Sequence, residues 1–178
     1  MNNKECEVKF LINKLPNLPA DTNVYYIEQY YFNPDNYQDI IKELFNLSSL
    51  DNINTYRVRK IKNNKVISYI LTLKSKGLYE RDEYETTINE ELFKKFINNK
   101  ISLIIKNRYI VFKDNFKFEF DEYLNLKEIL YTVEVEDDDI ENKIPLIEEI
   151  LKNQFKIECK NVSNDLRYRN SNLLKYFG

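Results

Sequence analysis

The sequence lacks several residue types on which common active sites depend. Its 178 residues include no His and no Trp, and only two Gly, two Cys and one Met. Without imidazole, Ser-His and Cys-His nucleophile pairs, a histidine general base and a His-based zinc site are excluded. With Gly77 and Gly178 as the only glycines, a glycine-rich phosphate loop is excluded as well. Any phosphate must therefore be held by side chains, and any metal by oxygen ligands, which favours Mg²⁺, Mn²⁺ or Ca²⁺.

Charge, length and cysteine content narrow the class further. Lys and Arg number 27 and Asp and Glu 29, so no net field attracts nucleic acid or a membrane. Cys6 and Cys159 have no CxxC spacing and are typical of reduced thiols in the cytoplasm. No apolar run reaches the roughly 20 residues of a membrane span, and the first residues do not resemble a signal peptide. We expect a single cytoplasmic domain over 1–178, a monomer or homodimer, without nucleic-acid or membrane partners.

Strand-like segments dominate the chain. They cover residues 4–13, 24–33, 54–62, 66–76, 79–89, 103–113, 116–124 and 129–137. Polar breaks at Asn63-Asn64 and Asp114-Asn115 indicate hairpins and hence antiparallel order. Helices are expected over 36–47 (with Asp35 as its cap), 90–96, 144–155 and 165–176. The pattern predicts a mainly β (α+β) fold, an eight-stranded antiparallel closed β-barrel with peripheral helices.

Charged residues recur two positions apart within these segments. A strand turns successive side chains to opposite faces, so this spacing places both members of a pair on one face. The pairs are Glu5/Glu7, Arg57/Arg59, Lys106/Arg108 and Glu134/Glu136. A solvated outer face explains any single pair, but it gives no reason to sort the pairs by sign, because opposed like charges destabilise a sheet. A metal–triphosphate site needs charges sorted by sign, with carboxylates for the cation and Lys or Arg for the phosphoryl oxygens. The solvated face and the metal–triphosphate site both stay open here.

Eight short motifs follow one another along almost the whole chain. They are Glu5-Cys6-Glu7-Val8-Lys9, Arg57-Val58-Arg59, Thr72-Leu73-Lys74, Arg81 with Glu83 and Glu85, Lys106-Asn107-Arg108-Tyr109, Glu119-Phe120-Asp121, Glu134 with Glu136, and Asp165 through Asn170. In this order they resemble the motifs of the CYTH family, the triphosphate tunnel metalloenzymes, and in particular its bacterial inorganic triphosphatases. The resemblance implies an eight-stranded antiparallel tunnel with the charged side chains inside, which agrees with the strand pattern.

The resemblance also implies roles for individual residues. The metal ligands, for Mg²⁺ or Mn²⁺ with two ions possible, would be Glu5, Glu7 and Glu136 first, and then Glu134 and Asp121. Phosphate oxygens would be bound by Lys9, Arg57, Arg59, Lys74, Arg81, Lys106, Arg108 and Lys160. Lys9 and Tyr31 would assist the attack of water. Glu83 and Glu85 are expected to pair with arginines of the tunnel.

The implied function is that of an enzyme, a divalent-metal-dependent triphosphatase. Inorganic tripolyphosphate is the preferred small-molecule substrate because nothing in the sequence reads as a nucleobase pocket. A thiamine triphosphatase, a nucleoside triphosphatase, a class IV adenylate cyclase and a non-catalytic polyphosphate-binding module stay open as alternatives. The chain departs from the family in two places. Tyr30 replaces a frequent glycine and is expected to narrow the tunnel or shift Tyr31, and the longer segment after residue 33 is expected to hold an extra helix.

Overall fold

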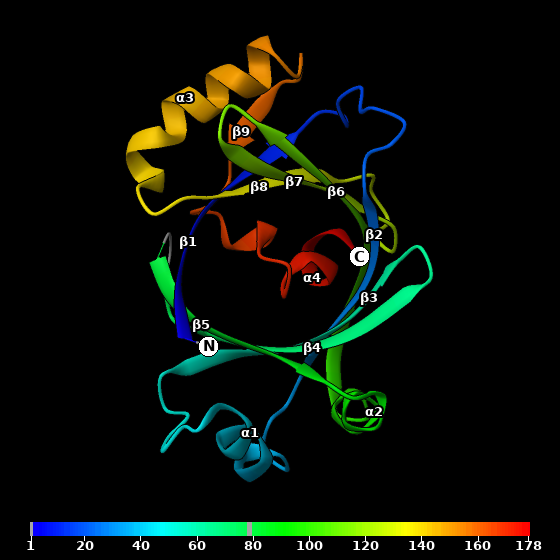
Figure 1. Ribbon diagram of the computed structural model, residues 1–178, viewed down its shortest axis with the longest axis vertical. Helices are drawn as coiled ribbons and strands as arrows, with labels where there is room; N and C mark the ends of the chain where they lie inside the picture. The colour runs from blue at the N-terminus through cyan, green and yellow to red at the C-terminus, as the bar shows by residue number, and fades with distance from the viewer. Residues whose placement is uncertain (1, 78–79) are drawn as a thin grey trace.

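The computed structural model describes residues 2–77 and 80–178, and its strands close into a ring (Figure 1). The ring consists of β1 (Asn2–Ile12), β2 (Val24–Phe32), β3 (Ile53–Asn63), β4 (Val66–Ser75), β5 (Glu80–Ile88), β6 (Lys100–Lys113), β7 (Phe116–Tyr123) and β8 (Tyr131–Glu136). Neighbours are antiparallel in the order β5-β4-β3-β2-β6-β7-β8-β1, and β1 pairs back to β5. The predicted eight-stranded closed barrel is confirmed. The short β9 (Cys159–Asn161), which was not predicted, adds to β1.

Both predicted hairpins are present. Lys113 pairs with Phe116 across the two residues Asp114 and Asn115. Asp114 and Asn115 have φ of 48° and 68°, the left-handed backbone of the tight turn that fits the twist of paired strands. Asn64 has φ of 52° between β3 and β4. Asn and Asp tolerate this conformation better than other residues with a side chain, so the polar breaks determine where the strands reverse.

Four helices flank the ring: α1 (Gln38–Phe45), α2 (Glu90–Ile97), α3 (Ile140–Asn153) and α4 (Leu173–Phe177). The extra helix between β2 and β3 is therefore confirmed as α1. Asp35 does not cap it, because its carboxylate accepts a hydrogen bond from Asn33 Nδ2 at 3.0 Å and α1 begins after Tyr37. Helix α3 begins four residues before the predicted 144, with Ile140 buried.

The predicted helix over 165–176 is wrong. A single 3₁₀ turn, Leu166–Tyr168, is followed by Arg169 in extended conformation, with φ of −66° and ψ of 130°. The extended residue breaks the helical path, and only the last turns form α4. As a result, residues 168–171 run along the cavity inside the ring.

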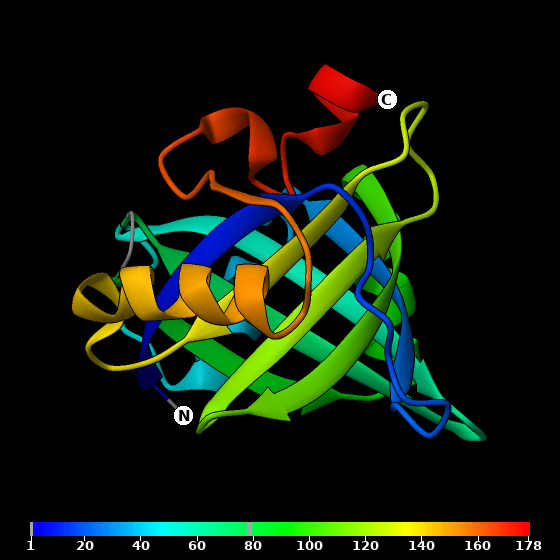
Figure 2. The same cartoon turned by 90° about the horizontal axis from the view of Figure 1, so that it is seen from above.

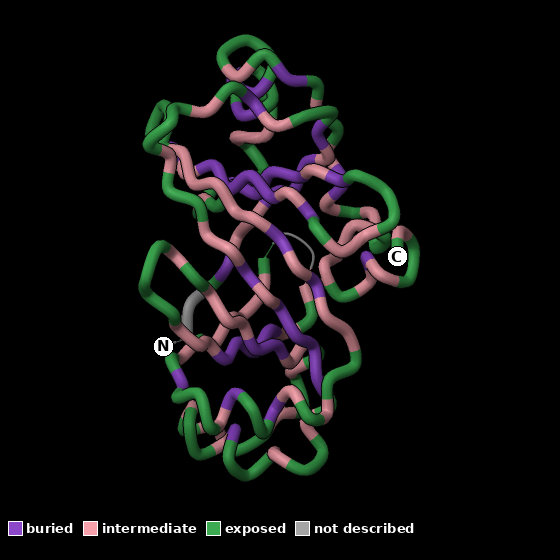
Figure 3. The backbone as a smooth tube through the Cα atoms, turned by 90° about the vertical axis from the view of Figure 1, so that its right-hand side faces the viewer, coloured by how far each residue is buried: buried purple, intermediate pink, exposed green. Residues whose placement is uncertain are grey.

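Two apolar cores lie outside the barrel, each under helices (Figures 1 and 3). Helix α3 covers the outward side chains of β1, β7 and β8, among them Val8, Phe118 and Val135. Helices α1 and α2 cover β2, β3 and β4. Because the outward positions are apolar, the alternation of each strand leaves the charged residues for the interior.

A third, smaller apolar group lies at one end of the barrel, where α4 is seen in Figure 2. Leu173 of α4 packs there with Ile104, Tyr123 and Leu130. Tyr30 belongs to the outer core, where its ring meets Phe93 edge-on at 5.6 Å between centroids. The expectation that Tyr30 narrows the tunnel is therefore wrong, since it points away from the interior. No helix in residues 2–77 and 80–178 has the length and apolarity needed to cross a membrane.

Candidate active site

A cavity of about 750 Å³ lies inside the barrel and is lined mainly by charged side chains. The structure brings together there most of the residues singled out from the sequence, namely Glu5, Glu7, Lys9, Tyr31, Arg57, Arg59, Lys74, Arg81, Glu83, Glu85, Arg108, Glu134 and Glu136. Every strand from β1 to β8 except β7 supplies at least one of them. The period of two in the sequence thus places both charge signs around one interior space.

Lys160 does not belong to this set. It is exposed on β9, outside the residues that line the cavity, and its charge acts on Asp165, whose pKa it helps to lower after the Arg167 hydrogen bond. The expectation that Lys160 lines the tunnel is wrong. The chain forms the unpredicted strand β9 on the edge of β1 there, beyond the closed ring.

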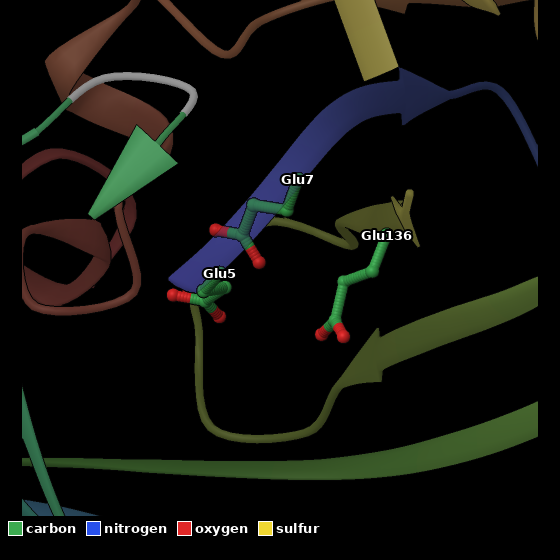
Figure 4. Close-up of side chains that lie close together, drawn as sticks. All are labelled: Glu5, Glu7 and Glu136. Carbon is green, nitrogen blue, oxygen red and sulfur yellow. The ribbon is translucent and has the colours of Figure 1, made fainter. Parts of the chain in front are cut away.

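Three carboxylates form an acidic group at the end of β1 and β8 (Figure 4). Glu5, Glu7 and Glu136 each offer an oxygen, and these oxygens lie within 4.8 Å of one another. Glu7 and Glu136 are directly opposite each other in the register of β1 and β8. Burial, and then the charges of Glu5 and Glu134, raises the pKa of Glu7 to about 7. Burial and the nearby Glu119 raise the pKa of Glu136.

Glu5 differs from its two neighbours because cations hold it. Lys74 Nζ lies 2.5 and 2.7 Å from its two carboxylate oxygens, and Arg81 Nε donates to it at 2.7 Å. Burial acts to raise the pKa of Glu5, but Lys74 and Arg81 outweigh it and lower the pKa to about 2. Arg81 also donates to Glu7 at 2.6 Å. Glu5 is thus ionised and fixed, and Arg81 links it to the rest of the acidic group.

A second pair of opposed carboxylates provides an internal comparison. Glu119 and Glu134 are opposite each other on β7 and β8, and the guanidinium of Arg108 bonds to both. Within the described residues, Glu136 makes no ion pair, and no shared cation bridges it to Glu7. Like charges that face each other across strands are destabilising, so the Glu7/Glu136 pair fits a cation from outside the chain. Its all-oxygen donor set suits a hard divalent ion.

Arginines on β3 form the opposite kind of group. Arg57 and Arg59 each have a buried Nε atom without a hydrogen-bond partner among the described residues. Arg57 reaches Glu83 only at 3.5 Å, and Arg59 pairs with Glu85 at 2.5 Å. The expected pairing of Glu83 and Glu85 with arginines is confirmed. Burial and the neighbouring Arg57 lower the pKa of Arg59 to about 10, because both disfavour a second positive charge at this place.

The charges of β6 are enclosed by their partners. Lys106 Nζ lies 2.5 Å from Asp121, and Arg108 binds the same carboxylate with Nε and Nη2, both at 2.7 Å. Lys106 is 1% exposed, Asp121 is fully buried, and neither lines the cavity. Asp121 therefore does not join the acidic group as expected, because both of its oxygens are occupied by cations. Lys106 likewise lies behind the cavity wall and not in it.

Lys9 and Tyr31 both line the cavity, but the structure gives them different partners. Tyr31 accepts a hydrogen bond from Gln29 at 2.7 Å, and burial raises its pKa. The hydroxyl within hydrogen-bond distance of Lys9 is that of Tyr123, at 3.2 Å. Burial acts to lower the pKa of Lys9, but the carboxylate of Glu134, 3.0 Å away, outweighs it, so the net pKa is raised and Lys9 is a cation.

Sequence reasoning assigned no role to four residues of this site, although two of them, Glu119 and Asn170, belong to the motifs quoted above. Strand alternation contains the signal for three of them, since Gln29 precedes Tyr31 by two, and Glu119 and Tyr123 flank Asp121 by two on each side. The fourth, Asn170, accepts a hydrogen bond from Lys9 Nζ at 2.9 Å. It comes from irregular chain after the 3₁₀ turn, where no periodicity predicts which way a side chain points.

Comparisons with known proteins support the fold. No family model matches the chain, and no curated protein matches it. The solved structure of the inorganic triphosphatase NE1496 is similar, with 24% identity over 98% of this chain and 97% of the other and a TM-score of 0.55. HpAC1 from Hippeastrum, described as a putative adenylyl cyclase with a dominant triphosphatase activity, shares 13% identity over 96% of this chain and 95% of its own, with a TM-score of 0.63.

A putative adenylate cyclase from Bacillus halodurans is also similar, with 15% identity, 87% of this chain and 91% of the other covered, and a TM-score of 0.55. At these identities the likeness concerns the arrangement of the chain. It agrees with the closed antiparallel ring described above. The resemblance first seen in the order of the sequence motifs is confirmed for the architecture: this chain has the CYTH, or triphosphate tunnel, fold.

Proposed function

We propose that this protein is a divalent-metal-dependent triphosphatase that hydrolyses inorganic tripolyphosphate to release orthophosphate. The observation that carries the proposal is the opposed pair Glu7 and Glu136. Arg81 bonds to Glu7, but within the described residues no cation pairs with Glu136 or bridges the two, and they share one cavity with the unsatisfied arginines of β3. An acidic group and a group of arginines in one cavity match a metal-bound polyanion better than either ion alone.

The cationic side chains would bind and neutralise the substrate. Arg57 and Arg59 have free Nε donors, and Lys9 and Arg81 add positive charge nearer the acidic group. In phosphoryl transfer most of the catalytic work is positioning and stabilisation of the charge on the equatorial oxygens. Charges already fixed by the barrel need no reorganisation when that transition state forms.

Glu5, Glu7 and Glu136 would hold Mg²⁺ or Mn²⁺ beside these donors. Glu134, on the same strand as Glu136, forms ion pairs with Lys9 and Arg108. When bound, such an ion supplies charge neutralisation for phosphoryl oxygens and lowers the pKa of a coordinated water. Burial, and then nearby carboxylates (Glu5 and Glu134 for Glu7, Glu119 for Glu136), raise the pKa values of Glu7 and Glu136, so a proton would compete with the metal for these oxygens.

The test is a phosphate-release assay with tripolyphosphate, pyrophosphate, thiamine triphosphate and ATP, each with Mg²⁺ or Mn²⁺. We expect release of orthophosphate from tripolyphosphate, abolished by EDTA. Formation of cyclic AMP from ATP would make the chain a cyclase. Binding without turnover of any compound would make it a polyphosphate-binding module, and preference for thiamine triphosphate or ATP would change the substrate.

A variant links the activity to the acidic group. Glu136→Gln keeps the size of the side chain but removes a charged ligand, so we expect kcat to fall by about 100-fold or more at saturating metal. Glu149→Gln is the matched control, since Glu149 is exposed on α3 away from the cavity. Retention of most activity by Glu136→Gln would remove this residue from the proposed metal site.

A further inference from the structure

The ammonium group of Lys9 is held by three acceptors from three parts of the chain. Nζ lies 3.0 Å from Glu134 Oε1 on β8, 3.2 Å from Tyr123 Oη on β7, and 2.9 Å from Asn170 Oδ1 after the 3₁₀ turn. An ammonium has three hydrogens, so each has one acceptor. A flexible four-carbon side chain, 8% exposed, is therefore fixed at its tip inside the cavity.

Asn170 contributes twice to this arrangement. Its Oδ1 accepts from Lys9, and it also accepts from Tyr123 Oη at 2.6 Å. Because an ammonium can only donate, the atom of Asn170 that faces Lys9 must be the amide oxygen, and its two lone pairs match the two donors. Lys9, Tyr123 and Asn170 thus form a closed triangle of hydrogen bonds.

The segment that supplies Asn170 is itself docked on the backbone of Lys9. Val162 N donates to Lys9 O at 2.9 Å, and Lys9 N donates to Ser163 Oγ at 2.9 Å. The same residue is therefore bound at its backbone and at its ammonium by residues 162–170. Extended Arg169 ends the 3₁₀ turn and leaves Asn170 among the residues that line the cavity.

Without Asn170, the nearest strong partner of Lys9 is the carboxylate of Glu134. A charged hydrogen bond of this kind would draw the ammonium fully onto the carboxylate and away from the phosphoryl oxygens. The neutral amide oxygen holds the third hydrogen without adding negative charge to a site built for a polyanion. An aspartate there would hold Lys9 but repel the substrate.

We infer that Asn170 is a positioning residue: with Glu134 and Tyr123 it binds the three hydrogens of the Lys9 ammonium and so fixes the place from which that positive charge acts on the phosphoryl group to be transferred. The inference rests on the proposed triphosphatase function. It adds that residues 162–170, which belong to none of the eight strands of the ring, complete the site. Asn170 itself touches neither the metal carboxylates nor the β3 arginines among the hydrogen bonds of the structure.

Steady-state kinetics with tripolyphosphate and Mg²⁺ test the catalytic part. For Asn170→Ala we expect kcat to fall about 10- to 100-fold with KM changed less than about threefold, since the Lys9 ammonium loses a hydrogen bond that holds it where charge develops in the transition state. For Asn170→Asp we expect kcat to lie above that of the Ala variant, because the acceptor is kept, while KM rises through charge repulsion.

Asn172→Ala is the matched control. Asn172 lies two residues further on and donates to Leu166 O at 2.8 Å, so it stabilises the same segment without contacting Lys9. Equal losses of kcat in Asn170→Ala and Asn172→Ala would reduce Asn170 to a structural role and overturn the inference. Unchanged kcat in Asn170→Ala would overturn it as well.

A second readout does not depend on turnover. The nitrogen-15 signal of the Lys9 ammonium, assigned by its loss in Lys9→Arg, should be visible in the parent because a buried, fully hydrogen-bonded ammonium exchanges slowly with water. We expect it to broaden or shift in Asn170→Ala and to persist in Asn172→Ala. If the parent hydrolyses no triphosphate, the proposed function fails, and this signal still decides whether Asn170 holds Lys9. A signal unchanged in Asn170→Ala would overturn that part.

Discussion

The Arg57/Arg59 pair on β3 and the Lys106/Arg108 pair on β6 have the same spacing and the same inward orientation, yet they differ in their partners. On β6 every contact is short, since Asp121, fully buried, bonds to both cations at 2.5 to 2.7 Å. On β3 the contact of Arg57 with Glu83 is 3.5 Å long, and both arginines keep an Nε without a partner among the described residues.

The difference suggests that the cations of β6 and those of β3 have separate roles in the barrel. The β6 network is complete in itself, so breaking it leaves a buried charge without its counter-ion, which is costly. The β3 pair is incomplete, and an unsatisfied buried donor already carries a desolvation cost that a ligand can relieve. We therefore interpret the β6 charges as structural and the β3 charges as available for substrate. The predictions below test this division.

The largest effect on stability is expected from Asp121→Asn. It removes the negative charge that neutralises the buried Lys106 and Arg108. We therefore expect the free energy of unfolding to fall by about 3–5 kcal/mol. Glu83→Gln is the matched change on the β3 side. Burial raises the pKa of Glu83 and its contact with Arg57 is long, so we expect a loss of about 1 kcal/mol or less.

Urea unfolding of the metal-free proteins measures both values. Equal losses in the two variants would contradict the division between a structural and an available charge group.

The next effect concerns binding. Tripolyphosphate with Ca²⁺, chosen as a non-hydrolysing metal, should raise the melting temperature of the parent by mass action. Arg57→Ala should weaken binding about tenfold or more and reduce the shift, because a charged donor to phosphate is lost. The melting temperature of the ligand-free variant should change little, since Arg57 is only loosely held.

Lys65→Ala, at the exposed β3–β4 turn, is the control and should keep the parent's shift. Absence of any shift in the parent would argue against triphosphate binding altogether.

A third effect is a pH dependence from the acidic group. The folded pKa of Glu7 is about 7, above the ordinary value of 4.5, so the folded state binds this proton more tightly than the unfolded state. Stability from this residue is present at pH 4.5 and is lost as the pH rises to 7, by about 3 kcal/mol in metal-free protein.

Glu7→Gln cannot ionise and should lose less stability over that range. Urea unfolding in EDTA at several pH values gives the two slopes, with Glu149→Gln as the control that keeps the parent's slope. If the free energy of unfolding changes with pH equally in the parent and in Glu7→Gln, folding does not raise the pKa of Glu7.

The same division marks the limit of what sequence could predict. Alternation along a strand determined the inward direction of Arg57 and Lys106 alike, so the barrel and the contents of its interior were predictable. Which inward cation is free depends on cross-strand register. Asp121 lies opposite Arg108, whereas Thr72, which is neutral, lies opposite Arg57. The two-residue turn Asp114-Asn115 determines the register of the β6–β7 hairpin, so the pairing of Asp121 with Arg108 could have been read from the sequence, and Asp121 was expected at the metal site only through the family resemblance. The register between strands that are distant in the sequence, such as Glu7 opposite Glu136, cannot be read in this way.

The placement of both large apolar cores on the outer face of the strands has a consequence for folding. A strand that slipped by one residue in its pairing would send every side chain to the opposite face. In β1 such a slip would place Glu7 and Lys9 under α3 and Val8 and Phe10 in the charged cavity. Burying charges in an apolar core and exposing apolar side chains in the charged cavity are both unfavourable. The charged residues of the interior therefore also disfavour misaligned strand pairing while the barrel assembles.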